Sequence, residues 1–173
     1  MSSLSFFLTV RTLHIFVAAL WFGGTVLFSR FVFPVARQVD PSGGRIMVEL
    51  SRRRFLLFMP TIAVATVVTG LWLYWHFTAG LDAHITSSLP GLVFGAGGLA
   101  GLIAMIVGGA MIGRRLERVV ALAELASGLP AGAEQTRHLQ EAAELQERAA
   151  GASRIDTALL AIALVLMAVG HYV

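Results

Sequence analysis

The chain has 173 residues, of which 57% are hydrophobic and only 13% are charged. This composition is typical of integral membrane proteins, and the length suffices for a single domain. Cysteine is absent, which excludes disulfides, thiolate metal ligands and cysteine nucleophiles. The net charge is +3 and every basic side chain except histidine is an arginine. These arginines flank apolar runs, so membrane topology explains them and no nucleic-acid partner is expected.

Four apolar segments follow one another along the chain. They cover about residues 6–29, 55–79, 89–113 and 155–173. Each is close to the roughly 20 residues that a helix needs to cross about 30 Å of hydrocarbon. The first is not expected to be a cleaved signal peptide, because it is too long and ends in an arginine. We therefore predict an all-α fold, an integral membrane up-down four-helix bundle that forms one domain.

The arginines predict the orientation of this bundle. Of the 13 arginines, six lie in the loop 30–54 and six in the loop 114–154, which leaves only Arg11 for the other face. Loops on the cytoplasmic side carry the excess of basic residues. We therefore expect a multi-pass protein of the bacterial inner membrane, with both loops in the cytoplasm and both termini outside.

The second arginine-rich loop is long enough to hold structure of its own. Its first part, "RRLERVVALAELASG", continues the third span with apolar residues at helical spacing, and Gly128 and Pro130 end it. The next part, "AEQTRHLQEAAELQERAA", has the pattern of a second amphipathic helix that leads into the fourth span. The sequence therefore predicts a cytoplasmic helical extension between helices three and four.

Four of the five histidines gather at the predicted outer face. His14 falls about one turn inside the first span, His76 at the boundary of the second, His84 in the outer loop, and His171 slightly inside the end of the fourth. Only His138 is on the cytoplasmic side. A helix rises about 1.5 Å per residue, so His14, His76 and His171 are expected to lie within roughly 6–8 Å of one another in depth in the membrane.

His14 is the strongest candidate for a functional residue. An ionisable side chain within an apolar span is by default a functional candidate. Two imidazoles from facing helices can hold a six-coordinate haem b, which suits electron transfer. His171 matches His14 best in depth, His76 is the other candidate ligand, and Arg11 is placed to bind a haem propionate. Room for a porphyrin would come from small residues, namely Gly23, Gly24, Gly97, Gly101 and Gly108.

Other functions fit the same residues. His14, His76, His84 and His171 could form a direct copper or zinc site, because neutral imidazole is a common metal ligand. His76 lies among Trp72, Tyr74 and Trp75, so it could equally belong to an interfacial aromatic belt. The glycines of the third span could instead join helices in a homodimer or larger assembly, which would suit a structural subunit without a cofactor.

The chain contains the segment "LHIFVAALWFGGTVLFSRFVFPVAR", an arginine run that follows it, a second span that contains "TGLWL" and a glycine-rich third span. In these features the chain resembles the copper-resistance protein D-type membrane proteins and their small relatives. The first span is also similar to that of HemJ-type protoporphyrinogen oxidase, in which a histidine precedes a tryptophan–glycine stretch. The resemblance implies a haem-binding role for His14, or copper handling, at the outer face.

The HemJ-type oxidases pair that first histidine with a histidine-x-lysine stretch in the third span. Here the third span has neither residue, and the chain has no lysine at all. We therefore expect little or no protoporphyrinogen oxidation. The leading expectation is a haem b protein that transfers electrons, with a quinone or a respiratory membrane complex as its partner.

Overall fold

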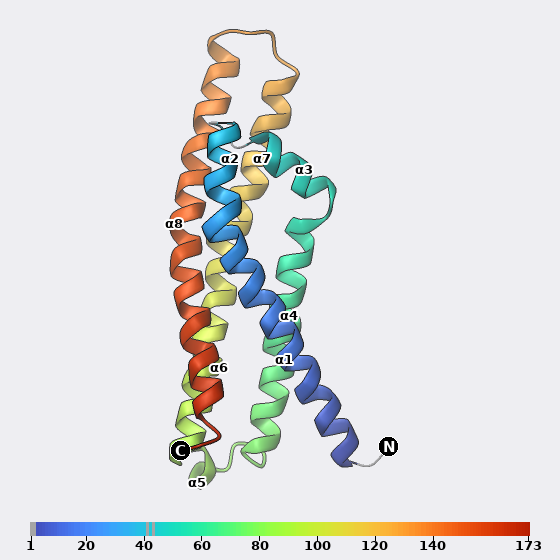
Figure 1. Ribbon diagram of the computed structural model, residues 1–173, viewed down its shortest axis with the longest axis vertical. Coiled ribbons are helices and arrows are strands. Elements are labelled where there is room, and N and C mark those ends of the chain that lie inside the picture. Colours follow the sequence, from blue (N-terminus) through green and yellow to red (C-terminus); the bar gives the residue numbers. More distant parts are fainter. Residues whose placement is uncertain (1–2, 41, 43) are drawn as a thin grey trace.

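The computed structural model describes residues 3–40, 42 and 44–173, and all secondary structure in this part of the chain is helical. Figure 1 shows long helices running side by side along one axis. Four helical runs are long and apolar enough to cross a membrane: Leu4–Val39, Phe55–Phe77, Leu89–Ser127 and Ala133–Val169. The prediction of an all-α membrane helical bundle is therefore confirmed.

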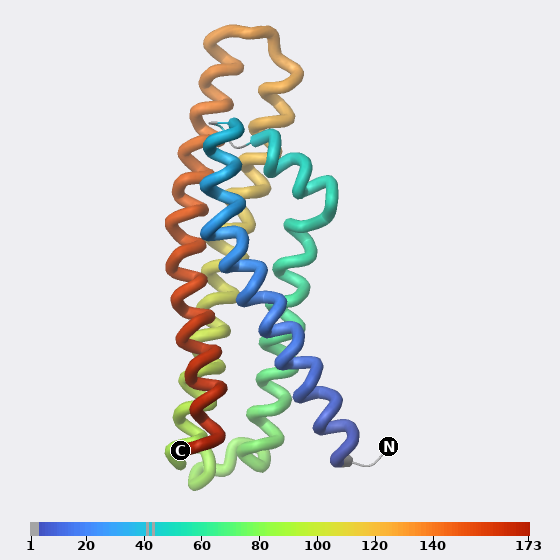
Figure 2. Tube along the Cα trace, in the orientation of Figure 1, coloured from blue at the N-terminus to red at the C-terminus, as the bar shows by residue number. Residues whose placement is uncertain are grey.

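The elements follow the chain in an up-down order (Figures 1 and 2). They are α1 (Ser3–Leu27), the π-helix η1 (Phe28–Val32), α2 (Phe33–Val39), α3 (Gly44–Arg52), α4 (Phe55–Phe77), α5 (Ala83–Thr86), α6 (Leu89–Val107), the π-helix η2 (Gly108–Gly113), α7 (Arg114–Ser127) and α8 (Ala133–Val169). Both chain ends lie at the same end of the bundle, which we call the termini end. The opposite end, which carries most of the arginines, is the arginine end.

The segment 30–54 differs from the loop that the sequence suggested. The first helix continues through η1 and α2 to Val39, and α3 follows from Gly44. The cause is a second apolar core at the arginine end, in which Phe33 and Met47 are buried against Leu122 of α7. Burial of these apolar side chains stabilises helices that a basic composition alone would not predict.

The helical extension is confirmed. α7 ends at Ser127, a short turn follows, and α8 begins at Ala133. The side-chain amide of Gln135 donates to the carbonyl of Ala126 at 3.1 Å and so ties the two helices together at this turn. Figure 1 shows this hairpin reaching beyond α2 and α3. α8 then runs without a break into the fourth span, as one helix of 37 residues.

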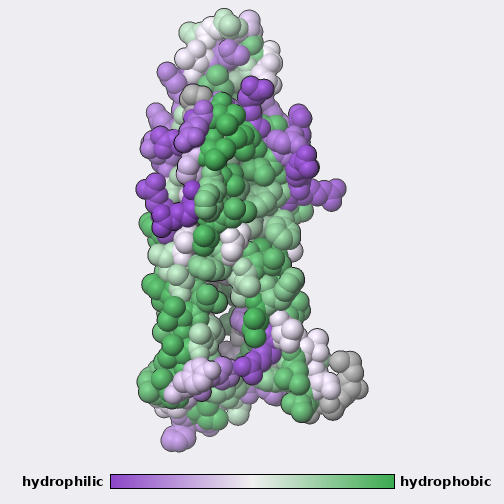
Figure 3. All heavy atoms as spheres, in the orientation of Figure 1, coloured by the Kyte–Doolittle hydropathy of each residue, from purple (hydrophilic) through white to green (hydrophobic). Residues whose placement is uncertain are grey.

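The helices pack in two pairs. α1 lies along α4, and α8 lies along α6 and α7, whereas α1 and α8 meet over a shorter length. Figure 2 shows α1 leaning away from α8 towards the termini end. In the space-filling view, an opening lies between α1 and α8 in this half of the bundle, and hydrophilic side chains gather at the arginine end (Figure 3). The fold therefore leaves space where the sequence predicts the functional residues.

Asp40 organises the turn into α3. Its Oδ1 accepts hydrogen bonds from the backbone N–H of Ser42 at 3.0 Å and the Ser42 hydroxyl at 2.8 Å, and its Oδ2 accepts from the N–H of Arg45 at 3.1 Å. Burial by itself would raise the pKa of Asp40, but these hydrogen bonds and the charge of Arg45 outweigh it and hold the pKa below the ordinary 3.8.

This shift makes part of the stability depend on pH. Because the folded-state pKa of Asp40 is lower than the ordinary value, its contribution is complete above that value and is lost as the pH falls through the folded pKa. We expect Asp40→Asn to lower the unfolding temperature in detergent at neutral pH and to match the unmodified protein in strong acid. Glu124→Gln, on an exposed part of α7, is the control. An Asp40→Asn difference that is independent of pH would contradict this role.

Candidate functional site

His14 is held against α4 by its Nδ1 atom. Nδ1 lies 3.0 Å from the carbonyl oxygen of Thr66 and 3.0 Å from the hydroxyl oxygen of Thr69. The half-buried imidazole also lies over Gly70, where a Cβ atom would come within 2.9 Å of its Cε1. Any larger residue at position 70 would push the ring away, so glycine permits the close approach of α1 and α4 at this level.

These contacts fix which nitrogen of His14 carries the proton. A carbonyl oxygen only accepts hydrogen bonds, so Nδ1 is the donor towards Thr66. The Thr69 hydroxyl donates to the carbonyl of Ala65 at 2.6 Å, which leaves its oxygen free to accept. In the neutral ring the lone pair then lies on Nε2, for which no hydrogen bond is found within the described residues. A ring oriented through Nδ1 with Nε2 available is the usual form of a metal-binding histidine.

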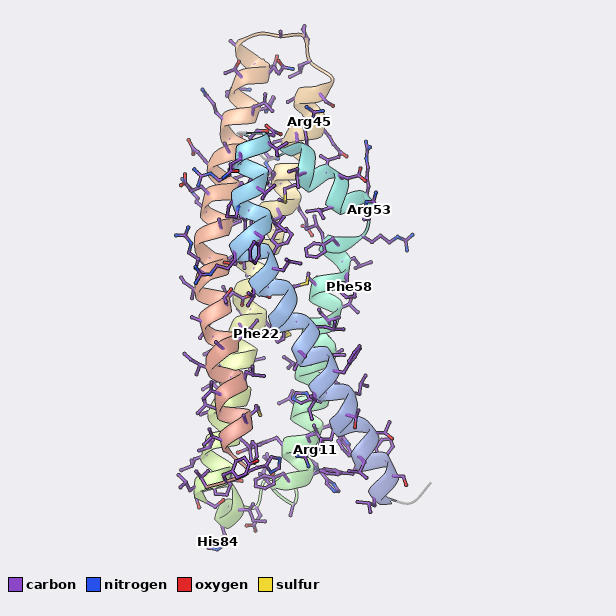
Figure 4. All side chains as sticks on the ribbon, viewed as in Figure 1. Arg11, Phe22, Arg45, Arg53, Phe58 and His84 are labelled. Carbon is purple, nitrogen blue, oxygen red and sulfur yellow. The ribbon has the colours of Figure 1, made fainter. Side chains whose placement is uncertain are left out.

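Arg11 and His171 come together across the termini end. Nη2 of Arg11 lies 2.6 Å from Nε2 of His171. Because a guanidinium only donates, Nε2 of His171 is the acceptor and Nδ1 carries its proton. Phe94 of α6 meets the His171 ring edge-on, with 5.4 Å between the ring centres. Figure 4 shows Arg11 at this end of the bundle.

The prediction that His171 lies slightly inside the fourth span is wrong. α8 ends at Val169, and His171 follows in the C-terminal turn. Gly170 is packed so closely on Phe94 that a Cβ atom would lie 2.7 Å from its ring. The chain turns at this glycine and directs His171 back towards α1.

His76 and His84 lie apart from this contact. The His76 ring stacks on Trp72 with 5.4 Å between centres and an interplanar angle of 7°, and Phe7 is 5.1 Å away. It therefore belongs to an aromatic cluster on the α1–α4 pair. His84 is exposed on α5, at the extremity of the molecule (Figure 4). Within residues 3–40, 42 and 44–173, no group of three or more histidine, aspartate or glutamate side chains could hold a metal ion.

One face of α6 has two glycines, and therefore no side chains, between Phe94 and Met105. On this face Phe94 contacts both Phe77 of α4 and His171, and Met105 packs on the buried cluster around Trp21. Gly98, which is exposed, and Gly101, which is half-buried, lie between them at helical spacing, and a Cβ atom at either position would find nothing within 4 Å. This unfilled stretch lies in the half of the bundle where Figure 3 shows the opening between α1 and α8.

The other glycines singled out in the sequence have different surroundings. A Cβ atom at Gly97 would lie 3.2 Å from Met167, so this glycine allows α6 and α8 to pack closely. Gly24 approaches Met59 in the same way, at 3.1 Å, whereas Gly23 is exposed and has open space around it. A Cβ atom at Gly108 would lie 3.9 Å from Oδ2 of Asp156. The open space on α6 therefore lies beside Gly98 and Gly101, and only Gly101 is among the glycines that the sequence predicts for this role.

A buried acidic residue lies outside the set of candidates predicted from the sequence. Asp156 of α8 is 3% exposed, and its Oδ1 has no hydrogen-bond partner within the described residues. The signal was present in the sequence, because "RIDTALLAIALVL" places an acid at the start of the fourth apolar segment. Acidic residues within spans are rare and usually functional.

No protein-family model, curated protein or solved structure matches the chain. The function must therefore be inferred from the residues of the site. These offer a neutral imidazole with a free nitrogen, a guanidinium that now donates to another imidazole, and an open space beside two glycines.

Proposed function

We propose that the protein binds haem b within its membrane bundle and transfers electrons, with His14 as one axial ligand. The observation that carries this proposal is the hydrogen bonding of His14. Its Nδ1 is anchored to Thr66 and Thr69 of α4, which leaves Nε2 free in the neutral ring. Metal-binding histidines are oriented by hydrogen bonds of this kind, because the donated N–H fixes the tautomer and the direction of the lone pair.

The surroundings of His14 fit a porphyrin in two further respects. A flat macrocycle needs a wall without side chains, and Gly98 and Gly101 leave open space on the face of α6 that carries Phe94 and Met105. Its propionates need cationic partners, and Arg11 lies one turn from His14 towards the termini end. When bound, the haem would supply one-electron chemistry at its iron, and the protein would supply ligation, orientation and an apolar environment.

His171 is the second ligand that we propose, and His76 is the alternative. In the present arrangement Nε2 of His171 accepts a hydrogen bond from Arg11. Arg11 carries several donors, so a carboxylate that draws its guanidinium away would release this nitrogen. Arg11 would then act as a positioning residue. It would hold His171 near the site until a haem propionate replaced His171 as the hydrogen-bond acceptor of Arg11. His76 would first have to leave its stack on Trp72.

A prediction separates the two candidate ligands. His171→Ala should weaken haem binding and alter the low-spin spectrum more than His76→Ala, because His171 is the one held at the open space by Arg11 and Phe94. Titration of each purified variant with haemin, followed by absorbance, measures both effects. The opposite order would make His76 the second ligand and would leave Arg11 and His171 as a pair at the surface.

The four apolar helices point to a lipid bilayer. We further propose that this is a bacterial inner membrane, with the termini end outside, because 12 of the 13 arginines then lie in the cytoplasm. The haem would be near the outer face. A quinone in the bilayer or a neighbouring respiratory complex could exchange electrons with it there. Direct copper or zinc binding by His14, His76, His84 and His171 has no comparable support. His76 stacks on Trp72, and His84 is exposed on α5.

The absorption spectrum of the purified protein tests this proposal. We expect a Soret band, and a pyridine haemochrome spectrum of the b type with haem and protein in equal amounts. A metal found by elemental analysis without a Soret band would instead show a bare metal site. Protein that contains neither, even after expression with added haem precursor, would indicate a structural subunit.

A further inference from the structure

Asp156 is buried without a partner for its charge. The residue is 3% exposed, its Oδ1 makes no hydrogen bond, and no ion pair found within residues 3–40, 42 and 44–173 includes it. Buried carboxylates in proteins are almost always paired, hydrogen-bonded or bound to a cation. A cation must therefore neutralise this group, or the group must be neutral.

The backbone of η2 lies directly against this carboxyl group. A Cβ atom at Gly108 would lie 3.9 Å from Oδ2 of Asp156, which is an ordinary van der Waals contact. In the π-helix η2, a backbone N–H bonds to the carbonyl five residues earlier instead of four. The N–H of Arg114, for example, donates to the carbonyl of Gly109. Such π-helical turns widen the helix and occur often at functional sites. Ser153, on the preceding turn of α8, is also buried.

Among the residues that the structure describes, no basic side chain forms an ion pair with Asp156. The arginines nearest to Asp156 along the elements that pack here are Arg30 of η1, Arg114 and Arg115 after η2, and Arg154 of α8; the other charged residues of α7 and α8 lie further towards the arginine end. Arg30, Arg114 and Arg154 are exposed, and Arg115 donates to the backbone carbonyl of Arg148 at 3.0 Å. α6 has no titratable residue. The titratable or charged residues of α1 and α4 are Arg11, His14, Tyr74 and His76. The first two belong to the first half of α1 and the other two to the last turn of α4, and these parts of the helices are at the termini end.

We propose that Asp156 is a reversible proton-binding site inside the bundle, beside η2. A carboxylate oxygen takes a proton from a hydronium ion and a water molecule leaves, so one O–H bond forms, one breaks, and no electrons are transferred. A metal cation would need several oxygen or nitrogen ligands, and no suitable cluster of side chains occurs in the described part of the chain. A proton needs only the carboxyl group. This site does not depend on haem binding.

Infrared spectroscopy of the purified protein in lipid at neutral pH tests this directly. We expect the carbonyl stretch of a protonated carboxyl group, which shifts when water is replaced by D₂O. Asp156→Asn should remove this band, and Asp156→Glu should keep a band at a changed frequency. Asp82→Asn, which alters an aspartate that accepts hydrogen bonds from the backbone N–H groups of His84 and Ile85, is the control and should leave the band in place.

Isotopic labelling keeps the test valid if Asp156→Asn fails to fold. The chain has only three aspartates, Asp40, Asp82 and Asp156, and the carboxylates of the first two accept hydrogen bonds from neighbouring N–H groups. In the unmodified protein, aspartate labelled with ¹³C at the carboxyl carbon should shift the band. A spectrum without a protonated carboxyl band, a band that the label leaves in place, or one that persists in folded Asp156→Asn would overturn the proposal.

Discussion

Replacement of His14 by alanine is expected to abolish haem binding while the protein still inserts into the membrane. The Nδ1 atom of His14 is held by Thr66 and Thr69 of α4, and its Nε2 atom has no hydrogen bond within the described residues. Partners that merely orient a ligand are worth about 10–100-fold in metal affinity, so loss of the ligand itself should cost more than about 100-fold. Insertion should persist, because apolar length and internal backbone hydrogen bonds hold the spans.

Two variants serve as controls for this result. His84→Ala removes an exposed imidazole from α5 and should leave the Soret band unchanged. Thr69→Val removes one of the two acceptors of Nδ1 but leaves the Thr66 carbonyl, so a loss of roughly 10-fold is expected. Haemin titration and circular dichroism of the same samples separate lost ligation from lost folding. If His14→Ala keeps its full haem content and an unchanged spectrum, His14 is only a hydrogen-bonded residue of the helix interface.

Reporters fused to the C-terminus should show on which side of the membrane it lies, because one kind of reporter should be active there and the other silent. We expect alkaline phosphatase fused after Val173 to be active and a cytoplasmic reporter at the same place to be silent. The reason is the arginine distribution, since six arginines in each of the segments 30–54 and 114–154 favour the cytoplasmic side for both. The C-terminus lies at the opposite end of the bundle from these segments.

The turn between α7 and α8 provides the complementary insertion site. This turn lies at the far tip of the arginine end, beyond the spans, so an inserted reporter there should show the reverse pattern. Activity of phosphatase in the turn and silence after Val173 would invert the topology. The site of Arg11, His14 and His171 would then open towards the cytoplasm, and the proposed partners outside would have to be abandoned.

The spans and the hairpin could be predicted because their signals are local. Apolar length identifies a spanning helix without reference to its neighbours. Gly128 and Pro130 mark the end of α7 for the same reason, since each acts on the backbone at its own position. The helices α2 and α3 could not be predicted in this way. They depend on Phe33 and Met47 reaching a core that is completed by α7, far along the chain.

The site could be predicted only in part. The sequence identified His14 as unusual, because an imidazole in an apolar span is conspicuous. It could not show the hydrogen bonds to Thr66 and Thr69, which require α1 and α4 to lie in one register. Nor could it place His171, whose direction is set by the turn at Gly170 after α8 has ended.

The most direct test of haem ligation by His14 is chemical rescue of His14→Gly. This variant leaves a cavity of the size of the lost ring beside Gly70, Thr66 and Thr69. Without added ligand it should bind little haem. Added imidazole should occupy the cavity and restore the Soret band and the low-spin spectrum, whereas the same concentration of a non-ligating analogue such as pyrrole should not. Full haem binding by His14→Gly without imidazole, or a low-spin spectrum that imidazole leaves unchanged, would contradict ligation by this residue.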